Sequence, residues 1–264
     1  MGVLQNPRYP LLMTTFPSTL RTWRKARRLS QLDLAGEAGV SARHISFLES
    51  GRSRPSPEMI GRLGDALALP LDARNQMLTH AGFAARYPGR AWGDVEMEPI
   101  RKAVSYMLEA HTPYPALAVD KLWTVMALNA PAAALYGMLG VGKGDSLLNL
   151  MMSENLPPLI ENWAQVARHA CQRLRMESAA QGGVPALDRA ADHLDRVPAP
   201  RDPVTTPVIP TILNTGSMRL SIFATIAQLG TPEDVALQDL KIELYFPTDD
   251  ASESLLRQMT EQSG

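Results

Sequence analysis

Residues 31–52 read QLDLAGEAGVSARHISFLESGR, and this stretch decides the fold of the N-terminal part of the chain. Ser30 and Ser41 each stand just before a run with helical spacing, which makes them suitable helix N-caps. Gly39 lies between the two runs, where a tight turn requires a backbone conformation that glycine adopts readily. The pattern therefore predicts two short helices joined by a sharp turn.

The two predicted helices separate apolar from polar positions. The inward positions fall on Leu34, Ala35, Val40, Ile45 and Leu48. The outward positions of the second helix are Arg43, Ser46, Phe47 and Ser50, and Ala42 lies in its exposed first turn. Such a face has few long acidic side chains and the size that a DNA major groove admits. The alternative interpretation is an ordinary solvent-exposed face of a helical bundle.

Three more helical runs and an uneven charge distribution surround this pair. Ser18 or Thr19 precedes LRTWRKARR, Pro57 opens EMIGRLGDAL, and PLDARNQMLTHAGF follows. Residues 19–54 contain eight Lys or Arg and three acidic residues, a balance of +5, whereas residues 83–264 contain fifteen basic and twenty-one acidic residues, a balance of −6. The sequence thus predicts a basic five-helix bundle that meets an anion, followed by a separate acidic domain.

Residues 20–67 resemble the Xre/Cro-type helix-turn-helix regulators over their whole length. The resemblance implies that Gln31 meets a phosphate or a neighbouring base, and that Ala42, Arg43 and Phe47 reach base edges. Ala42 departs from the polar residue often found at its position. Ser41, His44, Arg52 and Arg54 are the implied backbone contacts, with Ser46 on the same face. Arg24 and Glu49 match a pair that forms an inner salt bridge, which assigns them to architecture.

The acidic part begins after an irregular segment, residues 83–98, which we interpret as a linker. The next segments predict an amphipathic helix in MEPIRKAVSYMLEAH, two short strands in PALAVDKLWTVMALN, and helices over 130–139, 157–180 and 185–195. VPAPRDPVTTPVIP is expected to be a loop or an extended edge, and TPEDVALQDL is ambiguous. MRLSIFATIAQLG and KIELYFPT predict strands, and a last helix starts near Asp250.

Residues 113–137, PYPALAVDKLWTVMALNAPAAALYG, resemble the opening of the MmyB-like ligand-binding domain, a PAS-like module. The resemblance implies two domains: an all-α helix-turn-helix bundle at 18–82 and, after the linker, a mixed α/β PAS-like domain at 99–264. It further implies a regulator that binds double-stranded DNA and a small ligand, for which a lipid or fatty acid is one candidate. Because one such reader has few base-contacting side chains, we expect a homodimer.

The expected pocket is lined by side chains that adapt to apolar ligands. The candidates are Trp123, Met126, Leu128, Tyr136, Met151, Met152, Trp163 and Phe223. All of these residue types are also ordinary core residues. Candidates for holding a polar head group are Asn129, Arg168, His169 and Arg173, whose alternative role is helix-surface solvation.

Other functional classes find little support in the sequence. No apolar run reaches the roughly 18 residues of a membrane span, and residues 1–18 lack a signal-peptide core, so we expect a cytoplasmic protein without a membrane partner. Cys171 is the only cysteine, which excludes an internal disulfide. We expect no enzyme, no cofactor and no metal site. The alternative to a ligand sensor is an antitoxin-like DNA-binding protein whose C-terminal domain binds a partner protein.

Overall fold

The computed structural model describes residues 15–200, 207–230 and 232–263. The chain divides into two compact units, residues 1–86 and 87–264, so the division falls inside the segment that we interpret as a linker. Most of the stretch considered for a signal peptide (residues 1–14), the middle of the proline-rich segment (201–206) and two positions of the acidic domain (231 and 264) lie outside the described residues. Each unit is described by itself.

The first unit is a bundle of helices around one apolar core. Its described helices are α1 (Phe16–Ala26), α2 (Gln31–Ala38), α3 (Ala42–Glu49), α4 (Pro57–Ala66) and α5 (Leu71–His80). The five predicted helices are confirmed, but α1 begins before the predicted cap because Thr15 is its N-cap and Pro17 fits the first turn. Leu20, Leu34, Ile45 and Leu48 are fully buried in the shared core.

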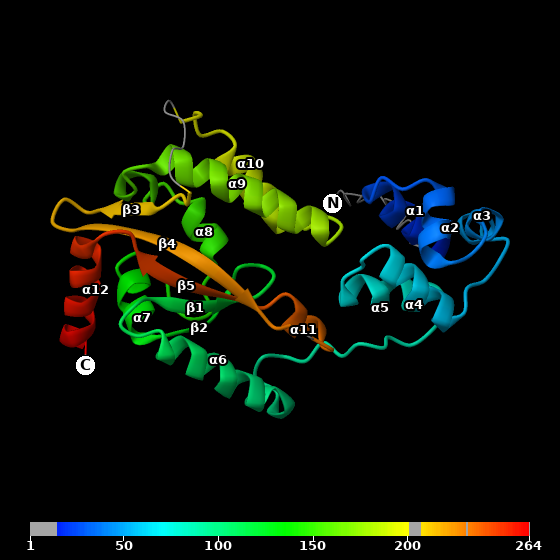
Figure 1. The fold of residues 1–264 in the computed structure, drawn as a ribbon, viewed down its shortest axis with the longest axis horizontal. Coiled ribbons are helices and arrows are strands. Elements are labelled where there is room, and N and C mark those ends of the chain that lie inside the picture. The colour runs from blue at the N-terminus through cyan, green and yellow to red at the C-terminus, as the bar shows by residue number, and fades with distance from the viewer. Residues whose placement is uncertain (1–14, 201–206, 231, 264) are drawn as a thin grey trace, which may run out of the picture. The chain divides into compact units, whose positions relative to one another are not determined.

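The second unit combines helices with a five-stranded sheet (Figure 1). Its helices are α6 (Glu98–Ala110), α7 (Ala130–Gly137), α8 (Leu147–Met151), α9 (Trp163–Ala180), α10 (Pro185–Leu194), α11 (Val235–Gln238) and α12 (Asp250–Ser263), with 3-10 turns η1 (Val95–Met97) and η2 (Pro157–Leu159). Its strands are β1 (Ala116–Val119), β2 (Val125–Leu128), β3 (Thr211–Asn214), β4 (Arg219–Gln228) and β5 (Lys241–Pro247). The predicted mixed α/β architecture is confirmed.

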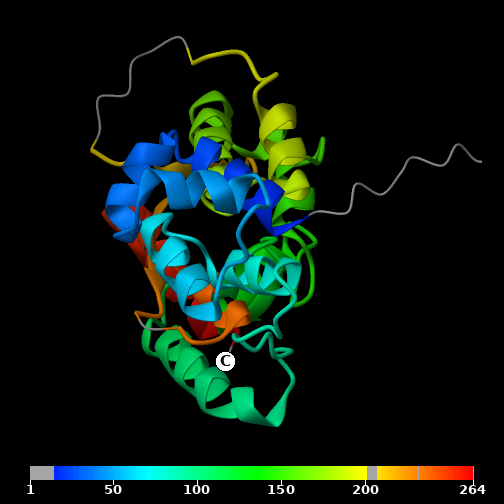
Figure 2. The ribbon, with the colours of Figure 1, turned by 90° about the vertical axis from the view of Figure 1, so that its right-hand side faces the viewer.

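The sheet is antiparallel throughout, with strand order β2-β1-β5-β4-β3. Alternate side chains of β1 serve two cores: Leu117 and Val119 pack in a cluster with residues of α9 and α10, whereas Ala116 and Ala118 pack with α6. Helices α9 and α10 run side by side on one face of the sheet (Figure 1 and Figure 2). The layer between α9 and the sheet is therefore one of the apolar cores of this unit.

Several elements differ from the sequence-based expectations. The helix expected over 157–180 is interrupted, because Ile160 is extended and bridges to Leu213, so that α9 starts at Trp163. Helix α8 and strand β3 were not predicted, and the ambiguous segment before β5 contains the short helix α11. No described helix is long and apolar enough to cross a membrane.

Candidate functional site

The turn between α2 and α3 is fixed by local bonds. Ser30 Oγ accepts a hydrogen bond from the Asp33 backbone N–H at 3.1 Å, and Ser41 Oγ accepts one from the His44 N–H at 3.2 Å. Gly39 has a φ of +63°, the left-handed conformation that glycine tolerates, and Arg62 donates to its carbonyl at 2.7 Å. The caps and the glycine predicted from the sequence are confirmed, and they set the direction of α3.

The exposed face of α3 gathers the residues that the resemblance assigned to DNA. Arg43 is exposed, and its guanidinium lies 5.1 Å from the Phe47 ring centroid, while that of Arg52 lies 6.0 Å from the same ring. Ser41 and Arg54 are also exposed; Ala42, His44, Ser46 and Phe47 are half-buried. Phe47 is thus an apolar side chain next to two cations, which is a surface suited to base edges and phosphates.

Glu49 lies behind this face and ties three helices together. Its carboxylate accepts hydrogen bonds from Arg24 Nε at 2.6 Å, Arg24 Nη2 at 2.9 Å and Gln31 Nε2 at 2.8 Å. The Glu49 side chain is 2% exposed and that of Arg24 12%. Burial opposes the charge on Glu49, but these hydrogen bonds and the cations outweigh it and hold its pKa below the ordinary value. The predicted inner salt bridge is confirmed.

The bond to Glu49 gives Gln31 a structural role that the sequence did not predict. The sequence assigned this residue to a phosphate or a base, yet its amide nitrogen is directed toward Glu49 and the side chain is half-buried. Its amide oxygen and second N–H make no hydrogen bond within the described part of the chain. Gln31 therefore braces α2 against α3, and its position at the start of α2 still allows a second contact.

The second unit contains an apolar pocket of about 160 Å³ between α7, α8, α9 and the sheet. Its lining includes four of the predicted residues, Trp123, Tyr136, Met151 and Trp163, together with aliphatic side chains such as Leu135, Leu150, Val166, Leu213 and Ile222. The lining residues with polar side-chain atoms are Trp123, Tyr136, Trp163, Thr211, Glu243 and Tyr245. Among the described residues that line it there is no Lys, Arg or His.

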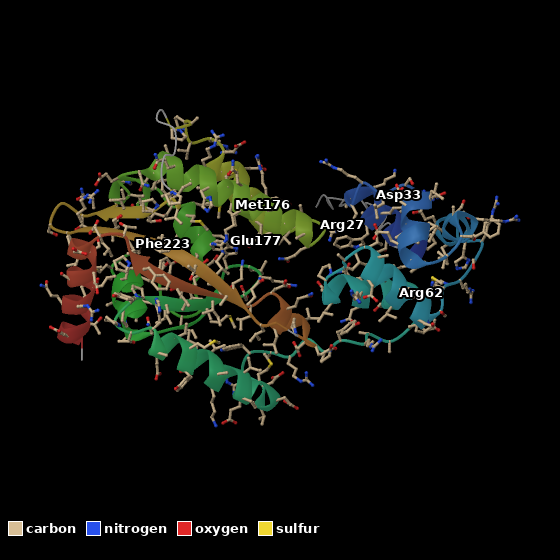
Figure 3. All side chains as sticks on the ribbon, viewed as in Figure 1. Arg27, Asp33, Arg62, Met176, Glu177 and Phe223 are labelled. Carbon is tan, nitrogen blue, oxygen red and sulfur yellow. The ribbon has the colours of Figure 1, made fainter. Side chains whose placement is uncertain are left out.

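Three of the predicted ligand contacts, Met126, Phe223 and Asn129, do not line this pocket. Met126 and Phe223 occupy the opposite faces of their strands, because side chains alternate along a strand. Met126 packs with the α6 cluster, and Phe223 on β4 stacks on Phe246 with 5.6 Å between ring centroids (Figure 3). Asn129 is the buried N-cap of α7, where its oxygen accepts from Ala132 N–H at 3.0 Å.

The residues expected to hold a polar head group do not line this pocket. Arg168 and His169 are exposed on α9, away from the pocket-lining positions Val166 and Ala170. Leu128 and Met152 pack against the core of this domain without lining the pocket. Arg173, for which we considered helix-surface solvation, is instead part of a buried ionic cluster.

The buried ionic cluster joins α9 to β5 beside the pocket. Arg173 donates to Glu177 Oε1 at 2.9 Å and to Glu243 Oε1 at 2.8 Å. Lys241 Nζ donates to Glu177 Oε2 at 2.5 Å, and Trp123 Nε1 donates to the same atom at 2.9 Å. Glu177 lies on the side of α9 that faces the sheet (Figure 3). We define Arg173, Glu177, Lys241 and Glu243 as the α9–β5 cluster; it contains two positive and two negative side chains.

Aromatic rings complete this cluster. Two cations approach the Trp123 ring: the guanidinium carbon of Arg173 is 4.3 Å from its centroid, and the ammonium of Lys241 is 4.5 Å away. Trp123 has a φ of +61°, an unusual value for a residue other than glycine. Tyr245 OH donates to Glu243 Oε2 at 2.7 Å, and the Tyr136 and Tyr245 hydroxyls are 2.6 Å apart. The pocket therefore ends at a closed polar network.

Burial sets the protonation of this network. Loss of solvent raises the pKa of Tyr136 and Tyr245, and the Glu243 charge acts in the same direction. Burial also lowers the pKa of Lys241, against the pull of Glu177. For Glu177, burial is again the largest influence and opposes its charge, but Lys241, Trp123 and Arg173 together bring its pKa below the ordinary value.

Sequence reasoning missed most of this network. Strand β5 alternates polar and apolar residues: Lys241, Glu243 and Tyr245 lie on one face, and Ile242 and Leu244 lie on the other. Arg173 and Glu177 are four residues apart and share one face of α9. Both signals are present in the sequence, but only the folded pairing of α9 with β5 turns them into one cluster.

The sequence profile of the MmyB-like transcription regulator ligand binding domain matches residues 100–259, and that of a helix-turn-helix domain matches residues 18–77. The chain belongs to the MmyB-like transcription regulators. The two matches account for the basic bundle and for the domain that contains the pocket. This regulator is a DNA-binding protein with a ligand-binding domain, and an antitoxin-like role is not favoured.

A curated relative points the same way. The HTH-type transcriptional repressor RghR of Bacillus subtilis (strain 168) is 33% identical over 99 residues, which cover 37% of this chain and 71% of that protein. Among solved structures, the PAS domain of Bordetella pertussis BvgS aligns with 61% of this chain and 96% of its own, with 15% identity and a TM-score of 0.29.

Proposed function

We propose that this MmyB-like regulator is a ligand sensor in which a small apolar molecule, bound in the pocket beside α9, changes the affinity of the helix-turn-helix domain for its operator. The observation that supports the proposal is the apolar pocket that ends at the α9–β5 cluster. A lipid-like ligand fits the apolar lining. We further propose that the regulator acts in the cytoplasm as a homodimer whose two α3 helices meet half-sites about one helical turn apart.

For DNA binding, we propose that α3 is the helix that contacts the base pairs. Arg43 has the exposed, stacked guanidinium that suits guanine O6 and N7, a contact that contributes about 1–3 kcal/mol of base discrimination. Arg54 is exposed beyond the helix, where it suits a phosphate. The experiment uses full-length protein and duplexes obtained by in vitro selection. Arg43→Ala should relax preference at one base pair, whereas Arg54→Ala should weaken binding to all duplexes and reduce the salt slope by about one.

The pocket part is tested by filling the pocket. Ala170 is a half-buried lining residue of α9, and Ala170→Phe would place a ring in the pocket; Ala179→Phe makes the same change at an exposed position of the same helix. Native mass spectrometry of the full-length protein should show a co-purified small molecule in the wild type and in Ala179→Phe but not in Ala170→Phe. Equal occupancy in all three proteins contradicts the proposal.

The homodimer is tested separately by sedimentation. The full-length protein should sediment as a dimer, both free and on its selected duplex, with one duplex per dimer. A monomer under both conditions contradicts the dimeric arrangement.

Sensing is tested by measuring DNA affinity with and without the co-purified molecule. The same affinity in both cases contradicts sensing.

We also propose that the regulator has no catalytic role. The strongest nucleophile candidate in the sequence, Cys171 with His169, is not supported by the geometry. Burial raises the pKa of the Cys171 thiol, whereas His169 is exposed on another side of α9. No group of three or more His, Cys, Asp or Glu suited to a metal ion occurs among the residues that the structure describes.

A further inference from the structure

Strand β4 continues past β3 and leaves part of one sheet edge without a neighbouring strand (Figure 1). The pairing of β3 with β4 stops where Thr211 lies opposite Ile222, whereas the pairing of β4 with β5 continues to the end of β4. Among the described residues, 223–228 therefore have a strand on one side only; we call them the β4 edge. Residues 224–226 are exposed in succession, and Ile226 is 47% exposed.

Backbone groups along β4 point alternately toward β3 and toward β5. In the turn that joins β3 to β4, the Thr215 N–H donates to the Met218 carbonyl at 3.0 Å. Every second residue from that point points its N–H and C=O toward β3. These residues are Met218, Leu220 and Ile222. The residues between them point toward β5, as shown by the Thr248 N–H, which donates to the Ser221 carbonyl at 3.0 Å.

The same alternation defines which groups are unpaired on the β4 edge. The register between β4 and β5 stays regular as far as Gln228 opposite Lys241. The N–H and C=O groups of Ala224, Ile226 and Gln228 are therefore directed away from β5, and within the described part of the chain they make no hydrogen bond. Such a row of donors and acceptors on a sheet edge is a template for another strand.

The β4 edge is complementary to a second copy of itself. Two antiparallel copies related by a two-fold axis at Ile226 place Ile226 opposite Ile226 and Ala224 opposite Gln228. Because all of these residues direct their backbone outward, each opposite pair exchanges two hydrogen bonds. Residues 220–230 contain no charged residue and no proline, so two copies meet without like charges and without a missing donor. The two Ile226 side chains lie on the same face and cover each other.

We propose that two copies of this regulator associate through antiparallel pairing of their β4 edges, with the two-fold axis at Ile226. The inference rests on the proposed homodimer and identifies its interface. Ile226 is also the cross-strand partner of Glu243, which lines the pocket. A ligand that moves β5 therefore acts on the contact between the two copies through a single pair of strands.

The register is tested with single cysteines in the full-length protein, whose only native cysteine, Cys171, is buried. Ile226→Cys places two thiols directly opposite each other, within reach of a disulfide. In the matched control Ala224→Cys, an exposed position on the same face, the two thiols are roughly 13 Å apart along the strands. Mild oxidation should produce covalent dimers of Ile226→Cys at least about tenfold faster than those of Ala224→Cys on a non-reducing gel. Equal rates, or faster cross-linking of Ala224→Cys, overturn the proposed pairing.

A charge pair tests the side-chain contact at the axis. Ile226→Lys and Ile226→Glu each place like charges opposite each other, so each variant alone should have a dissociation constant at least about tenfold higher than the wild type. An equimolar mixture should recover dimers in sedimentation, because lysine then lies opposite glutamate. The control is Leu122→Lys, at a residue that is 40% exposed in the turn between β1 and β2, and it should remain a dimer.

The outcomes separate this interface from the proposed homodimer. A wild-type protein that is monomeric both free and on its duplex overturns both. If the wild type is a dimer but the charged Ile226 variants stay dimeric, or their mixture recovers no dimers, the pairing of β4 edges is overturned and the homodimer stands. Melting temperatures check that the variants are folded, and if a charged variant does not fold, the comparison of Ile226→Cys with Ala224→Cys decides.

Discussion

Each domain of this regulator buries a glutamate beside an arginine, but the two arrangements serve different ends. Glu49 is enclosed by Arg24 and Gln31 inside the basic bundle, where its carboxylate joins α1, α2 and α3. The α9–β5 cluster instead contains two carboxylates and two cations, and Glu243 also lines a pocket. The bonds of Glu49 join α3 to α1 and α2, and so fix the position of the helix that we propose reads DNA. The α9–β5 cluster joins α9 to β5 beside the pocket, and its Glu243 can also contact a bound ligand.

The largest effect is expected from Glu49→Ala. Removal of one partner from a buried pair leaves the other charge unpaired, which costs roughly 3–5 kcal/mol, so amides of α1 to α3 should exchange much faster in the full-length protein. Hydrogen exchange read by mass spectrometry measures this by peptide. Asp65→Ala is the control, because Asp65 is 74% exposed in its pair with Arg74 and should change stability by less than about 1 kcal/mol. If Glu49→Ala changed the stability of the basic bundle very little, the Arg24–Glu49 pair would not have an architectural role.

A smaller effect is expected from Lys241→Met. Glu177 keeps its bonds from Arg173 and Trp123, and methionine fills similar space, so the loss should be about 1–3 kcal/mol. Hydrogen exchange of β5 peptides measures it. Lys102→Met makes the same change in an exposed pair with Glu98 and should be nearly neutral. If Lys241→Met lowered the free energy of unfolding as much as Glu49→Ala does, the bonds from Arg173 and Trp123 would not compensate Glu177 for the loss of Lys241.

The smallest difference between the two domains is expected in acid. Glu49 and Glu177 both have folded-state pKa values below the ordinary 4.5, so their stabilisation is present above that pH and disappears as the pH falls through the folded values. Protection from exchange, taken relative to the intrinsic exchange rate at each pH, should therefore fall in both domains from about pH 5 to about pH 3. In Glu49→Gln this loss of protection should be smaller in the basic bundle alone. An equal change in the α9 peptides would contradict this assignment.

The parts of the basic bundle that follow from neighbouring residues were predictable. Ser30, Ser41 and Gly39 act on the backbone within a few positions, so their caps and turn were recognisable in the sequence. The pairing of Arg24 with Glu49 spans 25 residues and was accessible only through the family resemblance. Helix α1 starts earlier than predicted, because Thr15 is its N-cap and Pro17 fits its first turn.

The pocket was predictable only in part, because its geometry depends on distant pairings. Residue type correctly suggested Trp123, Tyr136, Met151 and Trp163, but type does not reveal which face of a strand a side chain takes, so Met126 and Phe223 were misplaced. Strand β3 follows a proline-rich segment and is defined by its pairing with β4. The bond between Arg173 and Glu243 joins residues 70 positions apart, which no local pattern anticipates.

The bond between Gln31 and Glu49 has a consequence for the thermodynamics of DNA recognition. A glutamine side chain that becomes immobile on binding loses up to about 1.5–2 kcal/mol of rotamer entropy. Gln31 is already held by Glu49, and Arg43 already rests on Phe47, before any duplex is present. Under the proposed reading role, these side chains meet DNA with much of that entropy already lost during folding. On this proposal, the rigidity of the two side chains raises the affinity of the domain for DNA without additional contacts.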